Sequence, residues 1–222
     1  MKWKLFFLQQ FLITTNQIFR TCCRWKISWK PHSHFLSGKI SRMLGILFKI
    51  KSYLTPTAMK TIYNSLIYPH LQYGIIFWSG LNKSEYEKVF RLQKRAIRIM
   101  TKSLKYAHTG PIFKSLKILK LEDITKLEMC KFISQDLNNL NNFNFRPRST
   151  VHQHNTRYNS QLVLPFPRNN IMLNSVFYKG LQLYNGLPDD FKSIFDKNMF
   201  KVKLKTYLLS LYVWMGSSVW CS

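Results

Sequence analysis

The chain has 222 residues, of which 34 are Lys or Arg and 9 are Asp or Glu, so its formal net charge is +25. An excess this large attracts polyanions, which makes nucleic acid the first class of partner to expect and an anionic membrane surface the second. The four cysteines include no C-x-x-C pair, which argues against a disulfide scaffold and indicates a reducing compartment.

Patterns that predict secondary structure begin after residue 26. Residues 27–32 predict an extended or turn segment, because Pro31 disfavours helical dihedral angles at the residue before it. A helix is then predicted from about 33 to 53 on an apolar repeat of three to four residues. Gly45 lies inside this helix, where it costs about 1 kcal/mol relative to Ala, and we interpret it as a place where another helix approaches closely.

A second helix is predicted to begin at Thr55 and Pro56, with Thr55 as the N-cap and Pro56 in the first turn. Pro69 should kink it, and residues 79–80 should end it. The part after the kink, residues 71–78, is almost wholly apolar, which predicts a position at the centre of a helical bundle.

Residues 86–105 predict an amphipathic helix with one apolar and one basic face. Wound at 100° per residue, six cations fall within an arc of roughly 100°; they are Arg91, Lys94, Arg95, Arg98, Lys102 and Lys105. The opposite side carries Val89, Phe90, Leu92, Ala96, Ile97, Ile99 and Met100. Ser84 and Glu87 have the spacing of a capping box. No acid interrupts the basic stripe although like charges at this spacing repel, which favours an anionic partner over the alternative of an ordinary solvated face.

The remaining elements are shorter. Helices are predicted at 112–119, from 121 to 137, at 171–186 and at about 198–212, and Asp189 and Asp190 are predicted to cap a short turn. Residues 138–144 are rich in Asn, which ends the helix before them. Residues 145–170 predict a long acid-free loop whose arginines suit bidentate contact with phosphate; the three assigned to a second nucleic-acid contact are Arg146, Arg148 and Arg157. The expected fold is an all-α, irregular helical bundle with a long basic loop in its C-terminal half.

Catalytic and metal-binding patterns are not found. The sequence contains no Gly-rich phosphate loop and no G-x-S-x-G motif, and His152 and His154 have no Cys, Asp or Glu near them to complete a zinc site. The acidic doublet Asp189–Asp190 has no strand-like flanks of the kind that two-metal polymerase chemistry needs. We therefore expect no catalytic residue, no metal and no cofactor, and we find no stretch that reads as a membrane span.

A series of short phrases, in order over about residues 27 to 212, resembles the C-terminal segment of non-LTR retrotransposon (LINE) reverse transcriptases of the jockey and RTE type. The first half supplies ISWKPH at 27–32, KISR at 39–42, LGIL at 44–47, LTP at 54–56, IYNSLIYP at 62–69, LQYG at 71–74, Trp78 and LQKRAIR at 92–98. The second half supplies HNTR at 154–157, YNGLP at 184–188 (the family more often has Trp at the first position), FK at 200–201 and LK at 204–205.

This resemblance implies a fragment that begins just after the polymerase palm. The metal-binding Tyr-x-Asp-Asp motif of the family's palm is absent here, so no polymerase activity is expected from the chain alone. The matching region would be the helical thumb and the segment beyond it, which are expected to hold a template–product duplex or the element's RNA. The implied partners are RNA or an RNA/DNA hybrid, and a full-length reverse transcriptase in trans, in the nucleus or the cytoplasm.

The resulting organisation has an unmatched extension at 1–26, a thumb-like helical region at 27–137, an Asn- and Arg-rich loop at 138–170, C-terminal helices at 171–212 and an unmatched tail at 213–222. Two alternatives to nucleic-acid binding stay open at this point. One is a non-functional translated relic whose core no longer packs. The other is an interaction module that binds a protein, such as a full-length reverse transcriptase, through its apolar faces.

Overall fold

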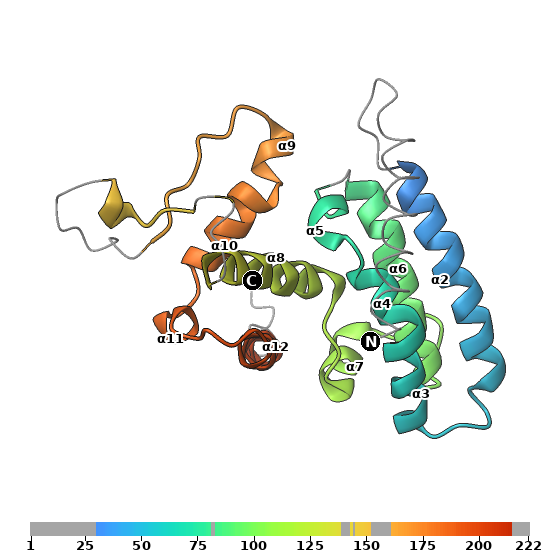
Figure 1. Cartoon of the computed structure of the whole chain (residues 1–222). Coiled ribbons are helices and arrows are strands. Elements are labelled where there is room, and N and C mark those ends of the chain that lie inside the picture. The colour runs from blue at the N-terminus through green and yellow to red at the C-terminus, as the bar shows by residue number, and fades with distance from the viewer. Residues whose placement is uncertain (1–29, 81–82, 139–142, 144, 152–160, 215–222) are drawn as a thin grey trace, which may run out of the picture.

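The described part of the protein is all-α, as predicted. The computed structural model describes residues 30–80, 83–138, 143, 145–151 and 161–214 (Figure 1). Within these ranges the regular structure is helical, and the extended backbone makes one isolated antiparallel bridge between Pro147 and Leu162.

Two long helices lie side by side in the N-terminal half: α2 (Lys30–Ile50) and α6 (Lys83–Met100) (Figure 1). The chain between them forms shorter helices: α3 (Pro56–Ile62), η1 (Tyr63–Ile67), α4 (Tyr68–Gln72) and α5 (Ile75–Trp78). Beyond α6 follow α7 (Thr109–Leu116) and α8 (Leu121–Asn138). The C-terminal part contains η2 (Arg148–Thr150), α9 (Asn170–Leu173), η3 (Val176–Gly180), α10 (Leu181–Asn185), α11 (Asp189–Lys192) and α12 (Lys197–Trp214).

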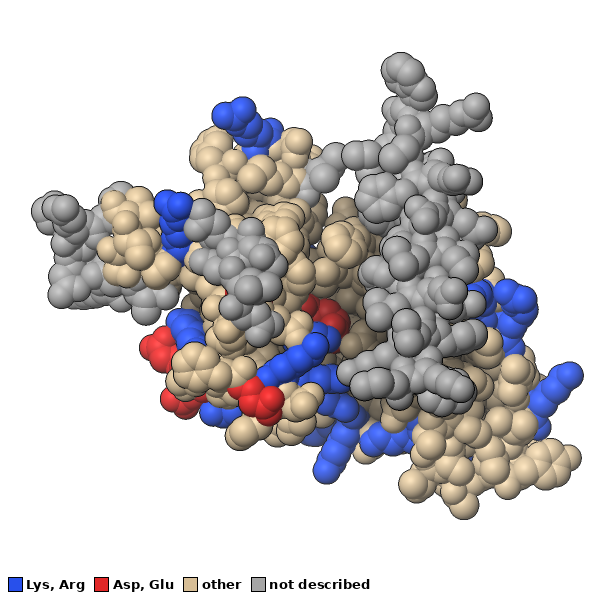
Figure 2. Space-filling model, viewed as in Figure 1, with Lys and Arg blue, Asp and Glu red and all other residues tan. Residues whose placement is uncertain are grey.

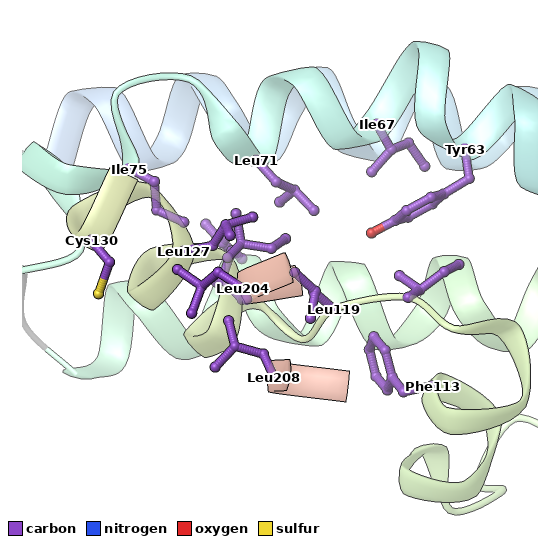
Figure 3. Packing of buried hydrophobic residues seen from close by; sticks show 14 of the residues in the cluster. Tyr63, Ile67, Leu71, Ile75, Phe113, Leu119, Leu127, Cys130, Leu204 and Leu208 are labelled. Atoms are coloured by element: carbon purple, nitrogen blue, oxygen red, sulfur yellow. The ribbon is translucent and has the colours of Figure 1, made fainter. Parts of the chain in front are cut away.

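Helix α8, rather than residues 71–78, occupies the centre of the fold. It contacts α4 and α5 on one side and η3, α10 and α12 on the other, so it joins the two halves (Figure 1). Figure 3 shows apolar side chains from these elements converging, among them Leu71, Leu127, Leu204 and Leu208. A helix contacted from several directions needs apolar or satisfied polar groups around its whole circumference, which explains why α8 has no clear amphipathic pattern.

Helix α2 begins at Lys30, three residues before the predicted start, and ends at Ile50. Pro31 lies in the first turn, where its missing amide hydrogen costs no intrahelical bond, so the predicted extended segment is wrong at residues 30–32. The apolar repeat itself is confirmed, since Leu36, Ile40, Leu44 and Leu47 are buried.

The interpretation of Gly45 as a site of close helix approach is wrong. A Cβ atom built at Gly45 would meet no atom within 4 Å, so no neighbouring helix requires glycine there. The close approach in this fold occurs at Gly180 of η3, where a Cβ would lie 3.0 Å from Val176 Cγ2 and 3.1 Å from Ile133 Cδ1 of α8. The sequence pattern does not distinguish the two glycines, because the distinction depends on which elements meet.

Replacing Gly45 with alanine should therefore raise the free energy of unfolding by about 1 kcal/mol, because alanine removes backbone freedom from the unfolded chain and clashes with nothing in the folded one. Urea denaturation followed by circular dichroism measures the change. Gly180→Ala is the contrasting variant, and it should gain less stability or lose some, because the Val176 and Ile133 side chains would have to give way by a few tenths of an ångström. Equal effects of the two substitutions would contradict this assignment.

The helix predicted from Thr55 is confirmed at its start and interrupted further on. The Thr55 hydroxyl accepts a hydrogen bond from the Ala58 amide at 3.3 Å, and Pro56 lies in the first turn. Before Pro69 the chain widens into the π-helical turn η1, and it breaks at Gly74, which has a left-handed φ of 59°. The Trp78 indole donates to the Tyr73 carbonyl at 2.9 Å across this break. Residues 71–78 therefore contain the end of α4 and the whole of α5 rather than one continuous helix.

The C-terminal helices also differ from their predicted form. Residues 171–186 are divided among α9, η3 and α10, whereas the helix predicted at 198–212 is confirmed as α12. Asp189 and Asp190 are the first residues of α11 and make no capping hydrogen bond; Asp189 instead pairs with Lys192 at 2.8 Å. The carboxylate that caps a helix here is Asp196, which accepts from the Met199 amide at 3.0 Å.

Candidate nucleic-acid interface

Helix α6 carries the predicted basic stripe, with ends that differ from those predicted. It begins at Lys83, so Ser84 lies inside the helix and the predicted capping box is wrong. Near this end the Glu85 carboxylate accepts hydrogen bonds from Lys88 at 2.7 Å and from Ser33 of α2 at 2.6 Å, and both bonds lower its pKa. Glu85 therefore fastens the beginnings of α2 and α6 together rather than capping a helix.

The helix ends at Met100, five residues before the predicted end. Lys102 has a left-handed φ of 52°, and the Ser103 amide returns to the Arg98 carbonyl at 3.0 Å while the Lys102 amide bonds the Ile99 carbonyl at 3.2 Å. This pair of bonds is a Schellman motif, which satisfies the last carbonyls of a helix. Lys102 and Lys105 therefore project from the loop that follows α6.

All six predicted cations line one groove of about 890 Å³. Arg91, Arg95 and Arg98 project from α6 at intervals of four and three residues, which keeps them on one side of the helix. Lys51, just beyond the end of α2, adds a seventh cation that the sequence pattern did not identify. The remaining lining residues are Phe48, Ile99, Ser103, Leu104 and Tyr106.

No acidic side chain lines this groove, and none of its seven cations forms an ion pair with another described residue. Their contacts are weaker ones: Lys94 Nζ lies 4.2 Å from the centre of the Phe90 ring, and Arg98 Nε donates to the Ala107 carbonyl at 2.9 Å. On the face seen in Figure 2, the right-hand edge over α2 and α3 likewise shows only basic charged side chains among the described residues. Seven cations without counter-charges produce a positive potential that an anion would relieve.

The apolar face of α6 is confirmed for most of its members, and it contains a polar residue that the pattern missed. Val89, Ala96, Ile97, Ile99 and Met100 are buried, whereas Phe90 and Leu92 are half-buried. Gln93 is fully buried although it lies within the LQKRAIR phrase. Its Nε2 donates to the Leu119 carbonyl at 2.9 Å and to the Tyr63 hydroxyl at 3.0 Å, and its Oε1 accepts from the Leu121 amide at 2.9 Å.

Arg146 and Arg148, two of the three arginines predicted as a second contact, do not line this groove. Arg146 and Arg148 flank Pro147 in the segment drawn at the left of Figure 1, whereas α6 lies on the right. Arg146 lines a separate pocket of about 430 Å³ together with Phe143, Phe145 and Phe177. Arg157 lies outside the described residues. Arg146 and Arg148 therefore lie apart from the α6 groove, and their role as a second nucleic-acid contact stays a prediction.

The long loop is tied to the helices by one asparagine. The Arg148 amide donates to the Gln161 carbonyl at 2.8 Å and the Val163 amide to the Arg146 carbonyl at 2.9 Å, so the two ends of the loop pair with each other. The Asn185 side chain then accepts from the Leu162 amide and donates to the Leu162 carbonyl, both at 2.9 Å. Asn185 thus binds the backbone as a neighbouring strand would.

Replacing Asn185 with alanine should release this loop, because Leu162 loses both partners at a cost of about 2 kcal/mol. Limited trypsin digestion should then cleave between residues 146 and 163 several-fold faster than in the original chain. Asn198→Ala, an exposed position in the first turn of α12, is the control and should leave the rate unchanged. Equal cleavage of the two variants would remove Asn185 from this role.

The described residues contain no group of three or more His, Cys, Asp or Glu side chains placed to hold a metal ion. Burial raises the pKa of the Cys130 thiol to about 12, which keeps it protonated and unreactive near neutral pH, and burial lowers the pKa of His32. His152 and His154 lie outside the described residues. Across the same part of the chain, no helix has the length and apolarity to cross a membrane.

What distinguishes the groove is the combination of seven cations with exposed apolar side chains. Phosphate contacts from Arg and Lys position nucleic acids without reading their sequence. Comparison of the chain with family models, curated proteins and solved structures gives no match.

Proposed function

We propose that this chain binds the phosphate backbone of RNA or of an RNA/DNA hybrid in the groove along α6. The observation that carries the proposal is the convergence of Lys51, four cations of α6 and two of the following loop on one surface without an acidic partner among the described residues. Binding of this kind is insensitive to base sequence and strongly sensitive to salt, because each phosphate contact releases condensed counterions.

The spacing of the cations supports backbone contact. Arg91, Arg95 and Arg98 are separated by four and three residues of α6, and seven residues of helix rise about 10 Å. Lys102 follows in the loop beyond the helix. The cations thus form a row rather than a compact cluster, which suits a polymer of phosphates better than one small anion. Arg98 is also held in place by its bond to the Ala107 carbonyl, so part of this row is ordered before any ligand binds.

The resemblance to non-LTR retrotransposon reverse transcriptases supports the same proposal, because LQKRAIR contributes Lys94, Arg95 and Arg98 to the groove. We propose that the chain corresponds to the thumb and following segment of such an enzyme. Since the sequence holds no Tyr-x-Asp-Asp motif, the proposed activity is binding and not DNA synthesis.

Fluorescence anisotropy of a labelled structured RNA, titrated with the full chain at 50 mM and 200 mM salt, tests this proposal. With five or more phosphate contacts, affinity should fall at least a hundredfold between the two conditions. A thermal melt by circular dichroism in the same buffers should be cooperative, and RNA should raise its midpoint mainly at low salt. Salt-independent binding would contradict backbone recognition, and a non-cooperative melt would favour a relic without a packed core.

A further inference from the structure

The groove contains exposed apolar side chains that phosphate contacts do not use. Phe48, Leu104 and Tyr106 line it beside the cations, and their exposed fractions are 56%, 83% and 86%. Single exposed apolar residues are ordinary, but three gathered in one basic groove form a surface of the kind that marks a binding site. A duplex presents its phosphates outward and its base faces inward, so it would leave these side chains in water.

The loop that carries Leu104 and Tyr106 is held in place by several hydrogen bonds. Arg98 Nε donates to the Ala107 carbonyl at 2.9 Å, the Ala107 amide bonds the Leu104 carbonyl at 3.0 Å, and the Ser103 amide bonds the Arg98 carbonyl at 3.0 Å. The exposed Tyr106 ring therefore lies on an ordered loop beside the cations of the groove. A ring held in this way loses little freedom when a planar group stacks on it.

The cations and the rings are close enough to act on the same nucleotides. Lys51 Nζ lies 4.0 Å from the centre of the Phe48 ring, and Lys105 Nζ lies 5.5 Å from the centre of the Tyr106 ring. Both lysines have flexible side chains that reach a phosphate when a base covers the neighbouring ring. Positively charged grooves with aromatic side chains are the general solution for single-stranded nucleic acids.

We infer that this groove binds unpaired RNA, with bases stacked on Tyr106 and Phe48 and phosphates on the cations of α6. The inference rests on the proposed function. It narrows the class of ligand from any RNA or RNA/DNA phosphate backbone to single-stranded segments of RNA. Stacking accepts any base, so the groove would prefer unpaired over paired RNA without preferring a sequence.

Three labelled probes of equal length test the inference with the full chain at 50 mM and 200 mM salt: a single-stranded RNA 12-mer, the same 12-mer paired with its complement, and an abasic 12-mer that keeps the phosphates. The single strand should bind about tenfold or more tightly than the abasic strand, since each stacked base adds a factor of that order. It should also bind more tightly than the duplex, despite the higher charge density of the duplex.

Substitutions of the aromatic residues test whether Phe48 and Tyr106 cause the preference for unpaired RNA. The double variant Phe48→Ala, Tyr106→Ala should bind the single-stranded probe no more tightly than the abasic probe. The variant Tyr106→Trp should retain or increase the preference for the single-stranded probe over the abasic one. Phe195→Ala removes another ring, 80% exposed and outside the groove, and should change nothing. Equal, salt-dependent binding of the single-stranded and abasic probes would overturn the stacking inference and leave the proposed function standing. Absence of salt-dependent binding to all three probes would overturn both.

Discussion

Replacing Arg91, Arg95 and Lys102 with glutamine should lower the affinity of the chain for a structured RNA on the order of a hundredfold at 0.1 M salt, because each lost phosphate contact removes the release of nearly one counterion. The slope of log affinity against log salt should become less negative by about 2 to 3. All three side chains are exposed in the groove, so the substitutions should leave the helical content and the melting temperature unchanged. Anisotropy titrations at four or more salt concentrations measure both quantities.

The choice of residues follows from the structure. Arg98 also lines the groove, but its hydrogen bond to the Ala107 carbonyl orders the loop after α6, so its removal would mix a structural effect with a loss of charge. Toward the described residues, the three chosen side chains donate no hydrogen bond of that kind; Arg91 Nε donates within its own helix, to the Glu87 carbonyl at 3.4 Å.

A matched control separates the groove from the net charge. Arg168, Lys179 and Lys197 are exposed residues of the C-terminal half, and their replacement by glutamine removes the same three charges. This control variant should lose only the small part of the affinity that comes from long-range attraction, which is largely screened beyond a Debye length of about 10 Å at this salt concentration. Similar losses in the two variants would show that the overall charge, and not the α6 groove, determines binding.

Replacing Gln93 with methionine should have the largest effect on stability, about 3–5 kcal/mol. Methionine has a similar length and volume, so the packing changes little, but the Leu119 carbonyl, the Leu121 amide and the Tyr63 hydroxyl lose a partner in the interior. A buried polar group without a partner costs about 1–3 kcal/mol. Since domains of this size are stable by about 5–15 kcal/mol, the variant should unfold at a much lower urea concentration.

The position of these three partners explains the size of the effect. Tyr63 belongs to η1, and Leu119 and Leu121 flank the turn from α7 into α8, so one side chain connects α6 to the elements on either side of it. Figure 3 shows the Tyr63 hydroxyl pointing into the core, where it accepts the bond from Gln93. Burial raises the pKa of this hydroxyl above its ordinary value.

Gln182→Met is the control for this prediction, because Gln182 is an exposed glutamine in α10. It should change the free energy of unfolding by less than about 0.5 kcal/mol. Tyr63→Phe removes one of the three hydrogen bonds of Gln93, and its loss in the free energy of unfolding should lie between those of Gln182→Met and Gln93→Met. A Gln93→Met variant as stable as Gln182→Met would mean that the buried network does not hold these helices together.

Helix α6 shows which features of burial a local sequence pattern predicts and which it does not. The 3.6-residue period correctly separated Ala96 and Ile97 from the cations at 91, 95 and 98, since a helix of fixed geometry places such residues on opposite sides wherever it lies. The same pattern gave no reason to place Gln93 in the core. Its burial depends on the carbonyl and amide that the turn before α8 presents to it, and that turn lies 26 to 28 residues away in the sequence.

The boundaries of the helices likewise differ in whether adjacent residues or more distant contacts determine them. Thr55 and Pro56 specify a helix start through the dihedral angles and hydrogen bonds of adjacent residues, and the structure confirms it. The end of α6 was placed too late, because the loop after Met100 is fixed by the bond from Arg98 to Ala107 and not by a residue that disfavours helix.

By itself the sequence determined the all-α class, the apolar faces of the long helices and the four cations on one side of α6, because each of these follows from the period of a helix and the charge of a side chain. Lys102 and Lys105 reach the same groove from the loop after the helix. Only the tertiary structure decided that Lys51 and Phe48 reach the same groove, that Tyr106 stands beside them, and that Arg146 and Arg148 lie elsewhere. These relations depend on how α2 packs against α6 and how Asn185 fastens the long loop, and such contacts between distant segments leave no periodic signal in the chain.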